Sequence, residues 1–106
     1  MERIKCIIKR PDEKYGHMTN ISCSLENLQK TVEGYIEAIT LRDDLVIICN
    51  EEGKIKGLEP NFRIGSRALF DVVCGTVIVI GTNEDEFADI PISLADWKRI
   101  LKEWGN

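Results

Sequence analysis

The sequence predicts an α+β fold, a mainly antiparallel sheet of about four strands packed by two helices in the order β-α-β-β-β-α. Three observations lead to this prediction. Residues 3–10 alternate between polar and apolar side chains, as in a strand. Two segments have apolar residues at helical spacing after a serine that can cap a helix. Two apolar runs, residues 45–49 and 71–81, suit strands in the interior of a sheet. Because a single core is usual for a chain of 106 residues, we expect one domain over residues 1–106.

The first two predicted elements are a half-exposed strand and a short helix. RIKCIIKR (residues 3–10) shows the period of two that is typical of a strand. The segment DEKYGHMTN that follows is interpreted as a loop or an irregular hairpin, and its histidine as a solvated side chain. Ser24 is a suitable N-cap for a helix in LENLQKTVE, and Gly34 supplies its end.

Beyond this helix the sequence predicts a hairpin of two strands. YIEAITL (residues 35–41) and LVIICN (residues 45–50) are joined by the short connection RDD. The second strand begins with five apolar residues, so we expect it to lie inside the sheet. In the first strand Glu37 interrupts an otherwise apolar face. Its carboxylate must reach solvent, a cationic partner or a ligand, because burying an unpaired charge is costly.

The second half of the chain is expected to supply the remaining strands. NEEGKIKG predicts a turn at residues 50–53 and a short returning strand at residues 54–57. DVVCGTVIVIG (residues 71–81) is interpreted as one central strand, in which Gly75 marks a bulge or a close approach of two backbones. We expect this strand to neighbour residues 45–49, since neither has a polar face.

An acidic loop and a second helix complete the predicted fold. TNEDEFADIPI is interpreted as an exposed loop, and Ser93 as the N-cap of a helix in LADWKRILKEW. The apolar stripe of this helix is expected to pack on the sheet and consists of Leu94, Trp97, Leu101 and Trp104. A groove for a partner or a stacking platform is the alternative use of such a stripe.

Composition excludes some classes of partner. The formal net charge of −4 and the pI near 5.0 argue against nucleic acid, because phosphate binding needs a basic face. The segment MERIKCIIKR lacks the uninterrupted apolar region of a signal peptide, and no stretch reaches the length of a membrane span. We therefore expect a cytoplasmic protein without a membrane partner.

The cysteines do not predict a metal site. They are widely spaced without a C-x-x-C pair, and His17 is the only histidine. Cys6, Cys49 and Cys74 lie in apolar runs and are expected in the core. Cys23 precedes a helix, where the pKa of a thiol can be lowered, yet no base accompanies it. Without a carboxylate pair or Cys-His pair at informative spacing, we expect no catalytic residue, no metal and no cofactor.

Polar residues concentrate between residues 34 and 65, where short connections should bring them to one surface. Seven of them are candidate ligand-binding residues: Tyr35, Glu37, Asn50, Lys54, Lys56, Asn61 and Arg63. Two explanations of the cationic members stay open. They bind an anionic ligand through charge-assisted hydrogen bonds, or they balance the acidic residues Glu51, Glu52 and Glu59. The glycines suit turns and do not match a phosphate-binding loop.

Several motifs together resemble a known family. They are G-Y-I-E at residues 34–37, N-E-E-G-K-x-K-G-L at residues 50–58, Asn61 with Arg63, the strand around Gly75, and Phe87 before the last helix. This pattern resembles domain-of-unknown-function family 3846, which comprises small proteins of bacteria, their phages and mobile elements. The tail FADIPISLADW departs from the simpler helix entry of the family. The resemblance implies a bacterial or phage cytoplasmic setting and no particular activity.

We expect a non-enzymatic binding module for a small anionic or nucleotide-like ligand, because cationic and amide groups gather after Asn50. The alternative is an acidic protein-interaction module or an inhibitor of a host protein, acting through the segment NEDEFAD. A homodimer is compatible with either function.

Overall fold

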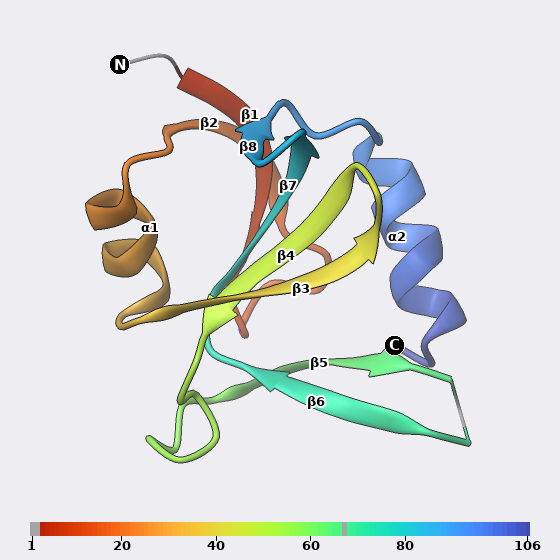
Figure 1. The fold of residues 1–106 in the computed structure, drawn as a ribbon. Helices are drawn as coiled ribbons and strands as arrows, with labels where there is room; N and C mark the ends of the chain where they lie inside the picture. The colour runs from red at the N-terminus through yellow and green to blue at the C-terminus, as the bar shows by residue number, and fades with distance from the viewer. Residues whose placement is uncertain (1–2, 67) are drawn as a thin grey trace.

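The computed structural model describes residues 3–66 and 68–106, and these residues form eight strands and two helices (Figure 1). Every strand pair is antiparallel. The predicted α+β class is confirmed. In chain order the elements are β1 (Arg3–Lys9), β2 (His17–Ser22), α1 (Leu25–Val32), β3 (Ile36–Arg42), β4 (Leu45–Asn50), β5 (Pro60–Gly65), β6 (Phe70–Cys74), β7 (Val77–Asn83), β8 (Glu86–Ala88) and α2 (Leu94–Glu103).

The sheet is larger than the sequence predicted. Six strands form the main sheet in the order β2-β1-β7-β4-β3, with β8 also paired to β7. The strands β5 and β6 form a separate two-stranded sheet, here called the ribbon. The prediction of about four strands was wrong, because β2 and β8 lie in polar segments whose alternation is too weak to predict strands. β2 pairs with β1, so of the two interpretations of DEKYGHMTN the hairpin is confirmed, and His17 is the first residue of its second strand.

The predicted hairpin and interior strands are present. β3 pairs with β4, and β4 pairs with β7 from Leu45 opposite Gly81 to Ile48 opposite Ile78. β1 lies on the other side of β7, so both β4 and β7 are interior strands. Every residue of β4 is buried, as its unbroken apolar run predicted.

Gly75 divides the predicted strand of residues 71–81 into β6 and β7. Its φ is 84°, and a Cβ at this position would lie 2.8 Å from Cδ1 of Leu58. The chain therefore leaves the ribbon after Cys74 and enters the main sheet at Val77. The prediction of one continuous strand was wrong, and the atoms that a Cβ at Gly75 would meet belong to the side chain of Leu58 rather than to a second backbone.

The turn after β4 is longer than predicted. Residues 51–57 form turns rather than a turn followed by a returning strand. The backbone amide of Lys56 donates to the Glu52 carbonyl at 2.9 Å, and the amide of Leu58 donates to the Gly53 carbonyl at 2.9 Å. These bonds satisfy the backbone locally, so this segment needs no partner strand.

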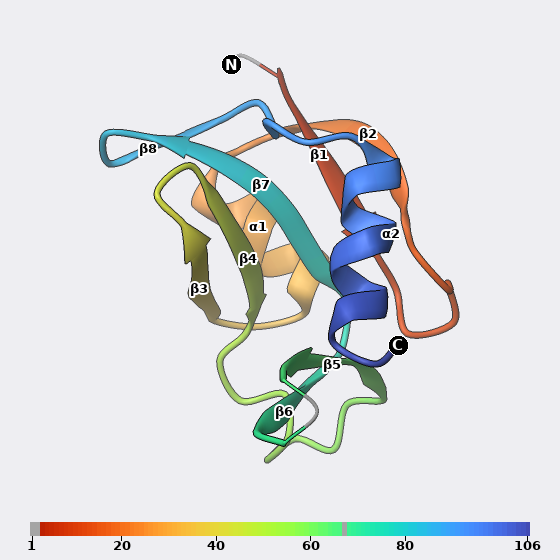
Figure 2. The same ribbon diagram turned by 90° about the vertical axis from the view of Figure 1, so that its right-hand side faces the viewer.

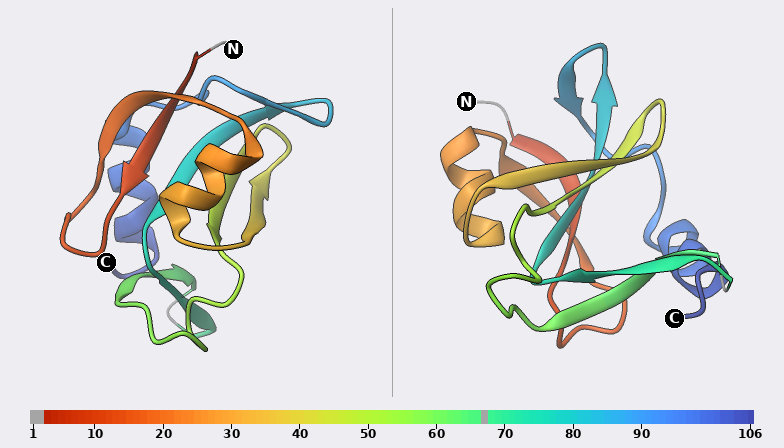
Figure 3. Two further views of the ribbon diagram at one scale, coloured as in Figure 1. Left: turned by 90° about the vertical axis from the view of Figure 1, so that its left-hand side faces the viewer. Right: turned by 60° about the horizontal axis from the view of Figure 1, so that its bottom comes forward.

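The two faces of the main sheet are covered by different elements (Figures 2 and 3). On one face Leu28 of α1 packs in a core with Ile48 of β4. On the other face Trp97 of α2 packs in a core with Ile47 of β4 and Phe62 of the ribbon. The side chains of successive residues in β4 therefore point alternately into the two cores. No helix among the described residues is both long and apolar enough to cross a membrane.

The ribbon is attached to α2 and to β1. Trp97 is fully buried and stands edge-on to Phe62, with ring centroids 5.6 Å apart. The predicted packing of the helix stripe on the sheet is therefore confirmed for Trp97. Asn106 beyond α2 accepts from the amide of Arg63 at 2.9 Å and donates to its carbonyl at 2.8 Å. These contacts hold the ribbon against α2 and the C-terminal residue that follows it.

Candidate functional site

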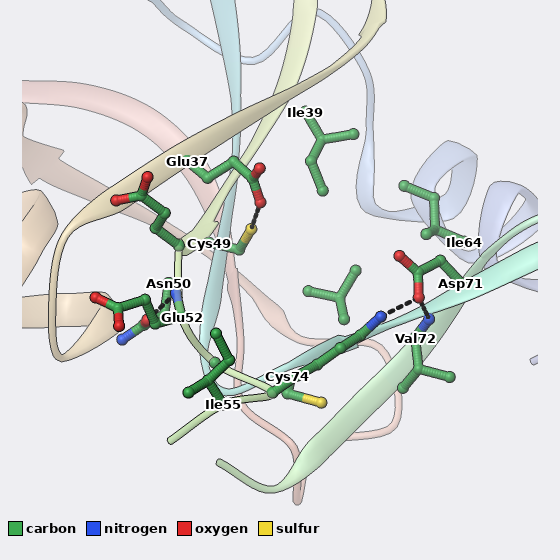
Figure 4. Close-up of a pocket in the computed structure, with 14 residues that line it drawn as sticks. Glu37, Ile39, Cys49, Asn50, Glu52, Ile55, Ile64, Asp71, Val72 and Cys74 are labelled. Atoms are coloured by element: carbon green, nitrogen blue, oxygen red, sulfur yellow. Dashed lines mark hydrogen bonds and ion pairs between the residues drawn. The ribbon is translucent and has the colours of Figure 1, made fainter. Parts of the chain in front are cut away.

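A pocket of about 240 Å³ lies between the main sheet and the ribbon (Figure 4). We call it the sheet–ribbon pocket. It is formed by β3, the end of β4, the turn that follows β4, and the ribbon. Its lining residues are Glu37, Ile39, Cys49, Asn50, Glu51, Glu52, Gly53, Lys54, Ile55, Ile64, Asp71, Val72, Val73 and Cys74.

The pocket combines apolar walls with acidic groups. Ile39 enters from β3 and Ile64 enters from the ribbon (Figure 4), and Val73 lies on the same face of the ribbon as Ile64. Four acidic residues, Glu37, Glu51, Glu52 and Asp71, contribute to the lining, and among the described residues Lys54 is its single cationic member. The carboxylate of Glu37 lies beside Cys49, whereas that of Glu52 points away from Asp71 (Figure 4). The charge of the pocket is therefore predominantly negative, in line with the acidic balance of the chain.

Glu37 stands on the pocket face of β3, beside the buried thiol of Cys49. The thiol of Cys49 donates to Oε1 of Glu37 at 3.8 Å. Burial raises the pKa of Cys49 to about 11, and the neighbouring carboxylate of Glu37 adds to this rise. Cys49 is thus a neutral thiol at neutral pH. No lysine or arginine in the described parts of the chain forms an ion pair with Glu37.

The only lysine of the pocket is already paired. Its Nζ donates to Oδ1 of Asp71 across the gap between the turn and the ribbon. This hydrogen bond raises the pKa of Lys54 and lowers that of Asp71. Both side chains are exposed, so water screens the pair and it adds little to stability. The pair matters for the pocket, because the ammonium group of Lys54 is already bound to Asp71 and is not free for a ligand.

The structure brings three of the seven candidate residues to the pocket. Glu37, Asn50 and Lys54 line it, whereas Tyr35, Lys56, Asn61 and Arg63 do not. Asn50 is buried and serves the backbone around it. Its Nδ2 donates to the Val32 carbonyl at the end of α1 at 3.0 Å, and its Oδ1 accepts from the amide of Glu52 at 2.8 Å.

Tyr35 and Lys56 lie beside the pocket on the surface. The side chain of Tyr35 is 65% exposed, and its backbone carbonyl accepts from the amide of Glu51 at 2.8 Å. Lys56 is exposed and its Nζ lies against Gly34, where an added Cβ would come within 2.9 Å of it. These two residues therefore remain accessible for contact with a ligand larger than the pocket.

Asn61 takes part in a network that joins three segments. Its Nδ2 donates to the carbonyl of Lys9 at 2.9 Å and to that of Gly75 at 2.8 Å, and its Oδ1 accepts from Nζ of Lys9. The side chain of Lys9 is buried, which lowers its pKa. Asn61 therefore fixes the ribbon to β1 and provides a partner for a buried cation.

Arg63 lies on the face of the ribbon that is turned away from the pocket. Its guanidinium stacks over the ring of Phe70, with its Cζ 3.8 Å from the ring centroid. A cation held in this way stabilises the exposed Phe70 locally. The structure thus distributes the expected cationic group over separate surfaces rather than one.

The sequence reasoning missed the ribbon side of the pocket. Asp71, Val72 and Cys74 reach it only because the chain breaks at Gly75 and folds back on β5. Two glycine signals, Gly65 and Gly75, bracket this segment and both have positive φ. Treating Gly75 as a break would have predicted a separate hairpin and placed Asp71 near the turn.

The described residues contain no cluster suited to a metal ion, and none of the thiols of Cys6, Cys23 and Cys49 has a lowered pKa. No group of three or more His, Cys, Asp or Glu side chains among them is arranged to hold a metal ion. Burial raises the pKa of Cys6 to about 12 and also raises that of Cys23, so neither thiol is activated. The pocket offers charge and apolar surface for binding.

The fold and the pocket define a small α+β protein with an acidic, partly apolar pocket at its sheet–ribbon junction. The chain belongs to the family described as Domain of unknown function (DUF3846), whose model matches residues 4–105. The resemblance seen in the sequence motifs is thereby confirmed. Comparisons with curated proteins and with solved structures find no match.

Proposed function

We propose that this protein is a binding module whose sheet–ribbon pocket takes a small ligand with a cationic head and an apolar body. The observation that carries the proposal is the charge of the lining residues, which include four acidic residues and one lysine that is already paired with Asp71. Carboxylates attract an ammonium or guanidinium group through charge-assisted hydrogen bonds, and the apolar walls cover a hydrocarbon body. Binding, without covalent chemistry, is the whole of the proposed function.

The anionic or nucleotide-like ligand that the sequence favoured has weaker support. Lys56 and Arg63 lie outside the lining, and the ammonium of Lys54 pairs with Asp71. An anion in the pocket would approach the acidic lining residues, and like charges in a partly desolvated site disfavour binding. The cationic ligand is therefore the better match to the charge of this pocket.

A protein partner is the second candidate, and one observation favours it. Ile55 lines the pocket and is 84% exposed, so an apolar side chain stands in water beside the carboxylates. The acidic segment NEDEFAD instead lies at the β7–β8 hairpin, which Figure 1 shows at the opposite end of the molecule from the ribbon. For either kind of ligand, we propose the setting that the family resemblance implies, the cytoplasm of a bacterium, with the protein encoded by the bacterium, its phage or a mobile element.

The proposal is tested by titrating the protein with butylguanidinium while its backbone amide signals are followed by NMR. We expect saturable shifts at Gly53 and Val72, which lie on opposite sides of the pocket. The thermal midpoint should rise with the ratio of ligand concentration to Kd. Two anions serve as comparators. Butyrate carries a carboxylate on a short hydrocarbon chain, and ATP represents the nucleotides. Shifts by ATP without shifts by butylguanidinium would reject the cationic ligand in favour of the anionic one.

Two variants of the protein test whether the acidic lining residues bind the cationic ligand. Glu37→Gln removes a lining charge and should weaken the binding of butylguanidinium about fivefold to tenfold, the range of one charge-assisted hydrogen bond. Glu59→Gln makes the same change of net charge at an exposed residue outside the lining, and it should leave binding unchanged. Equal losses in both variants would mean that net charge alone attracts the ligand.

A further inference from the structure

The strand β3 forms one edge of the main sheet and lies directly beside the pocket. In the described part of the chain it pairs with β4 only, so its other side carries unpaired backbone groups. Figures 1 and 3 show β3 on the outside of the sheet, with no other strand beyond it. A free edge of this kind is a template for pairing with another extended segment.

The register of β3 and β4 shows which backbone groups face outward. The carbonyl of Tyr35 accepts from the amide of Glu51, and Ile36 stands opposite Asn50. In an antiparallel ladder this pattern alternates along the strand, so Glu37 and Ile39 exchange hydrogen bonds with β4. The amides and carbonyls of Ile36, Ala38 and Thr40 therefore point away from β4. They form the free edge, which we call the β3 edge.

The β3 edge lacks the usual protection against pairing. From Ile36 to Thr40 it contains no proline and no lysine, and its register irregularity lies beyond this stretch, between Thr40 and Arg42. Ala38 and Thr40 are exposed. Natural edges are commonly blocked by prolines, by lysines or by bulges. Glu37 is the single charged residue of this stretch, and its side chain belongs to the pocket.

The pocket and the β3 edge form one continuous surface. Glu37 and Ile39 line the pocket from β3 itself. A strand added to the edge would run about 4.8 Å from β3, with every second side chain on the pocket face. Its side chain opposite Glu37 would be a direct cross-strand neighbour, and an opposite charge is favoured there.

We propose that the ligand of this pocket is an extended basic peptide segment, which pairs with the β3 edge and places a lysine or arginine side chain in the sheet–ribbon pocket. The proposal rests on the proposed function and specifies its ligand. Charge complementarity identifies the occupant, because the lining includes four acidic residues and the chain has a net charge of −4. Lysine and arginine also combine a hydrocarbon stem with a cationic end, as the mixed lining requires.

A second copy of the chain is a poorer occupant of the same edge. Antiparallel pairing of β3 with β3 around a two-fold axis would place both pockets on the same face of the joined sheet. The acidic lining residues of both copies would then lie on one face of the joined sheet. Repulsion between them opposes this dimer, whereas a basic peptide neutralises the same groups.

The test uses a heptapeptide in which lysine and valine alternate, with lysine at both ends and with an acetylated N-terminus and an amidated C-terminus. It is compared with variants of the peptide that are each methylated at one backbone amide nitrogen. The sheet is antiparallel throughout, so we expect the peptide to pair with β3 in the antiparallel direction. Lysines on the pocket face then direct their amides away from β3, and the valine amides donate to it. Methylating a central valine amide should weaken binding at least tenfold, and methylating a central lysine amide less than threefold.

A variant of the protein tests the same edge from the other side. Ala38→Pro removes an outward amide that β4 does not use, so the ladder between β3 and β4 is retained. The Ala38→Pro variant should bind the heptapeptide at least tenfold more weakly and bind butylguanidinium with unchanged affinity. The control variant Ala38→Ser should bind both ligands as the unmodified protein does. The methylated peptides keep the test valid on the unmodified protein if Ala38→Pro does not fold.

The outcomes separate the two proposals. Losses confined to the valine amides support antiparallel strand addition with lysines on the pocket face. Losses confined to the lysine amides would mean either parallel pairing or valines on the pocket face, and both overturn the antiparallel arrangement proposed here. Binding of butylguanidinium together with no peptide binding, or with methylation effects that do not alternate, overturns the peptide proposal and leaves the pocket proposal standing. Absence of binding by both probes rejects both. A dimer that Ala38→Pro dissociates would assign the edge to a second copy.

Discussion

Asn61 shows how a residue with the chemistry of a ligand site can instead hold the fold together. Its side chain bonds to the carbonyls of Lys9 and Gly75 and to the ammonium of Lys9. We predict that Asn61→Ala lowers the free energy of unfolding by about 2 kcal/mol, because it leaves partly buried polar groups without partners. Lys56→Ala, at an exposed candidate residue, should change it by less than about 0.5 kcal/mol. Urea denaturation of both variants measures the difference, and equal effects would contradict the structural role of Asn61.

The candidate residues divide according to how local their contacts are. Glu37, Asn50 and Lys54 were predictable neighbours in one pocket lining because a hairpin and one turn connect them. Arg63 was not, because strand alternation in the ribbon directs its side chain away from the pocket, and that register depends on a long-range pairing with Val72. Sequence spacing thus predicted neighbours along the chain and failed where a second sheet decides direction.

At the scale of elements, Gly75 determines where β6 ends and β7 begins. We predict that Gly75→Ala lowers the free energy of unfolding by about 2 kcal/mol, because alanine is strained at a φ of 84° and its Cβ would press on Leu58. Gly57→Ala is the matched control, since its φ is 72° but nothing lies within 4 Å of the added Cβ. It should cost about 1 kcal/mol, from backbone strain alone. Equal costs in denaturant unfolding would show that contact with Leu58 contributes nothing.

The start of α2 carries a pH-dependent contribution to stability. Oδ2 of Asp96 accepts from the amide of Ser93 at 3.1 Å, and this backbone hydrogen bond holds the pKa of Asp96 below its ordinary value of 3.8. A carboxyl with a depressed folded-state pKa stabilises the fold above its unfolded value and loses that effect as the pH falls through the folded value. We therefore expect Asp96→Asn to be less stable than the unmodified protein at neutral pH, and the difference to vanish near about pH 2.

Urea denaturation at the two pH values measures this effect, with Asp85→Asn as the control. Asp85 is exposed in the β7–β8 hairpin, and its side chain has no hydrogen bond within the described residues. Its substitution should leave stability unchanged at both pH values. A difference between Asp96→Asn and the unmodified protein that grows on acidification would contradict the assignment.

Elements with strong local signals were predictable and the rest were not. Serine caps at Ser24 and Ser93 and the stripes behind them predicted both helices, and each serine accepts a backbone amide as expected. The three-residue strand β8 was not predictable, because its pairing with β7 makes it a strand and its own pattern is too short. Apolar composition alone also could not distinguish one strand from two at Gly75.

For the whole molecule, the layered arrangement predicts a graded pattern of amide hydrogen exchange. β4 and β7 lie inside the sheet between two cores, so their amides should exchange most slowly and report global unfolding. Within β3 the ladder predicts an alternation, in which the amides of Glu37 and Ile39 are protected and that of Ala38 exchanges at close to the rate of an unfolded chain. NMR of the free protein at low and high concentration measures both features. Protection of Ala38 that increases with concentration would show that a second copy already occupies the β3 edge, and protection that is independent of concentration would show that the chain itself covers it.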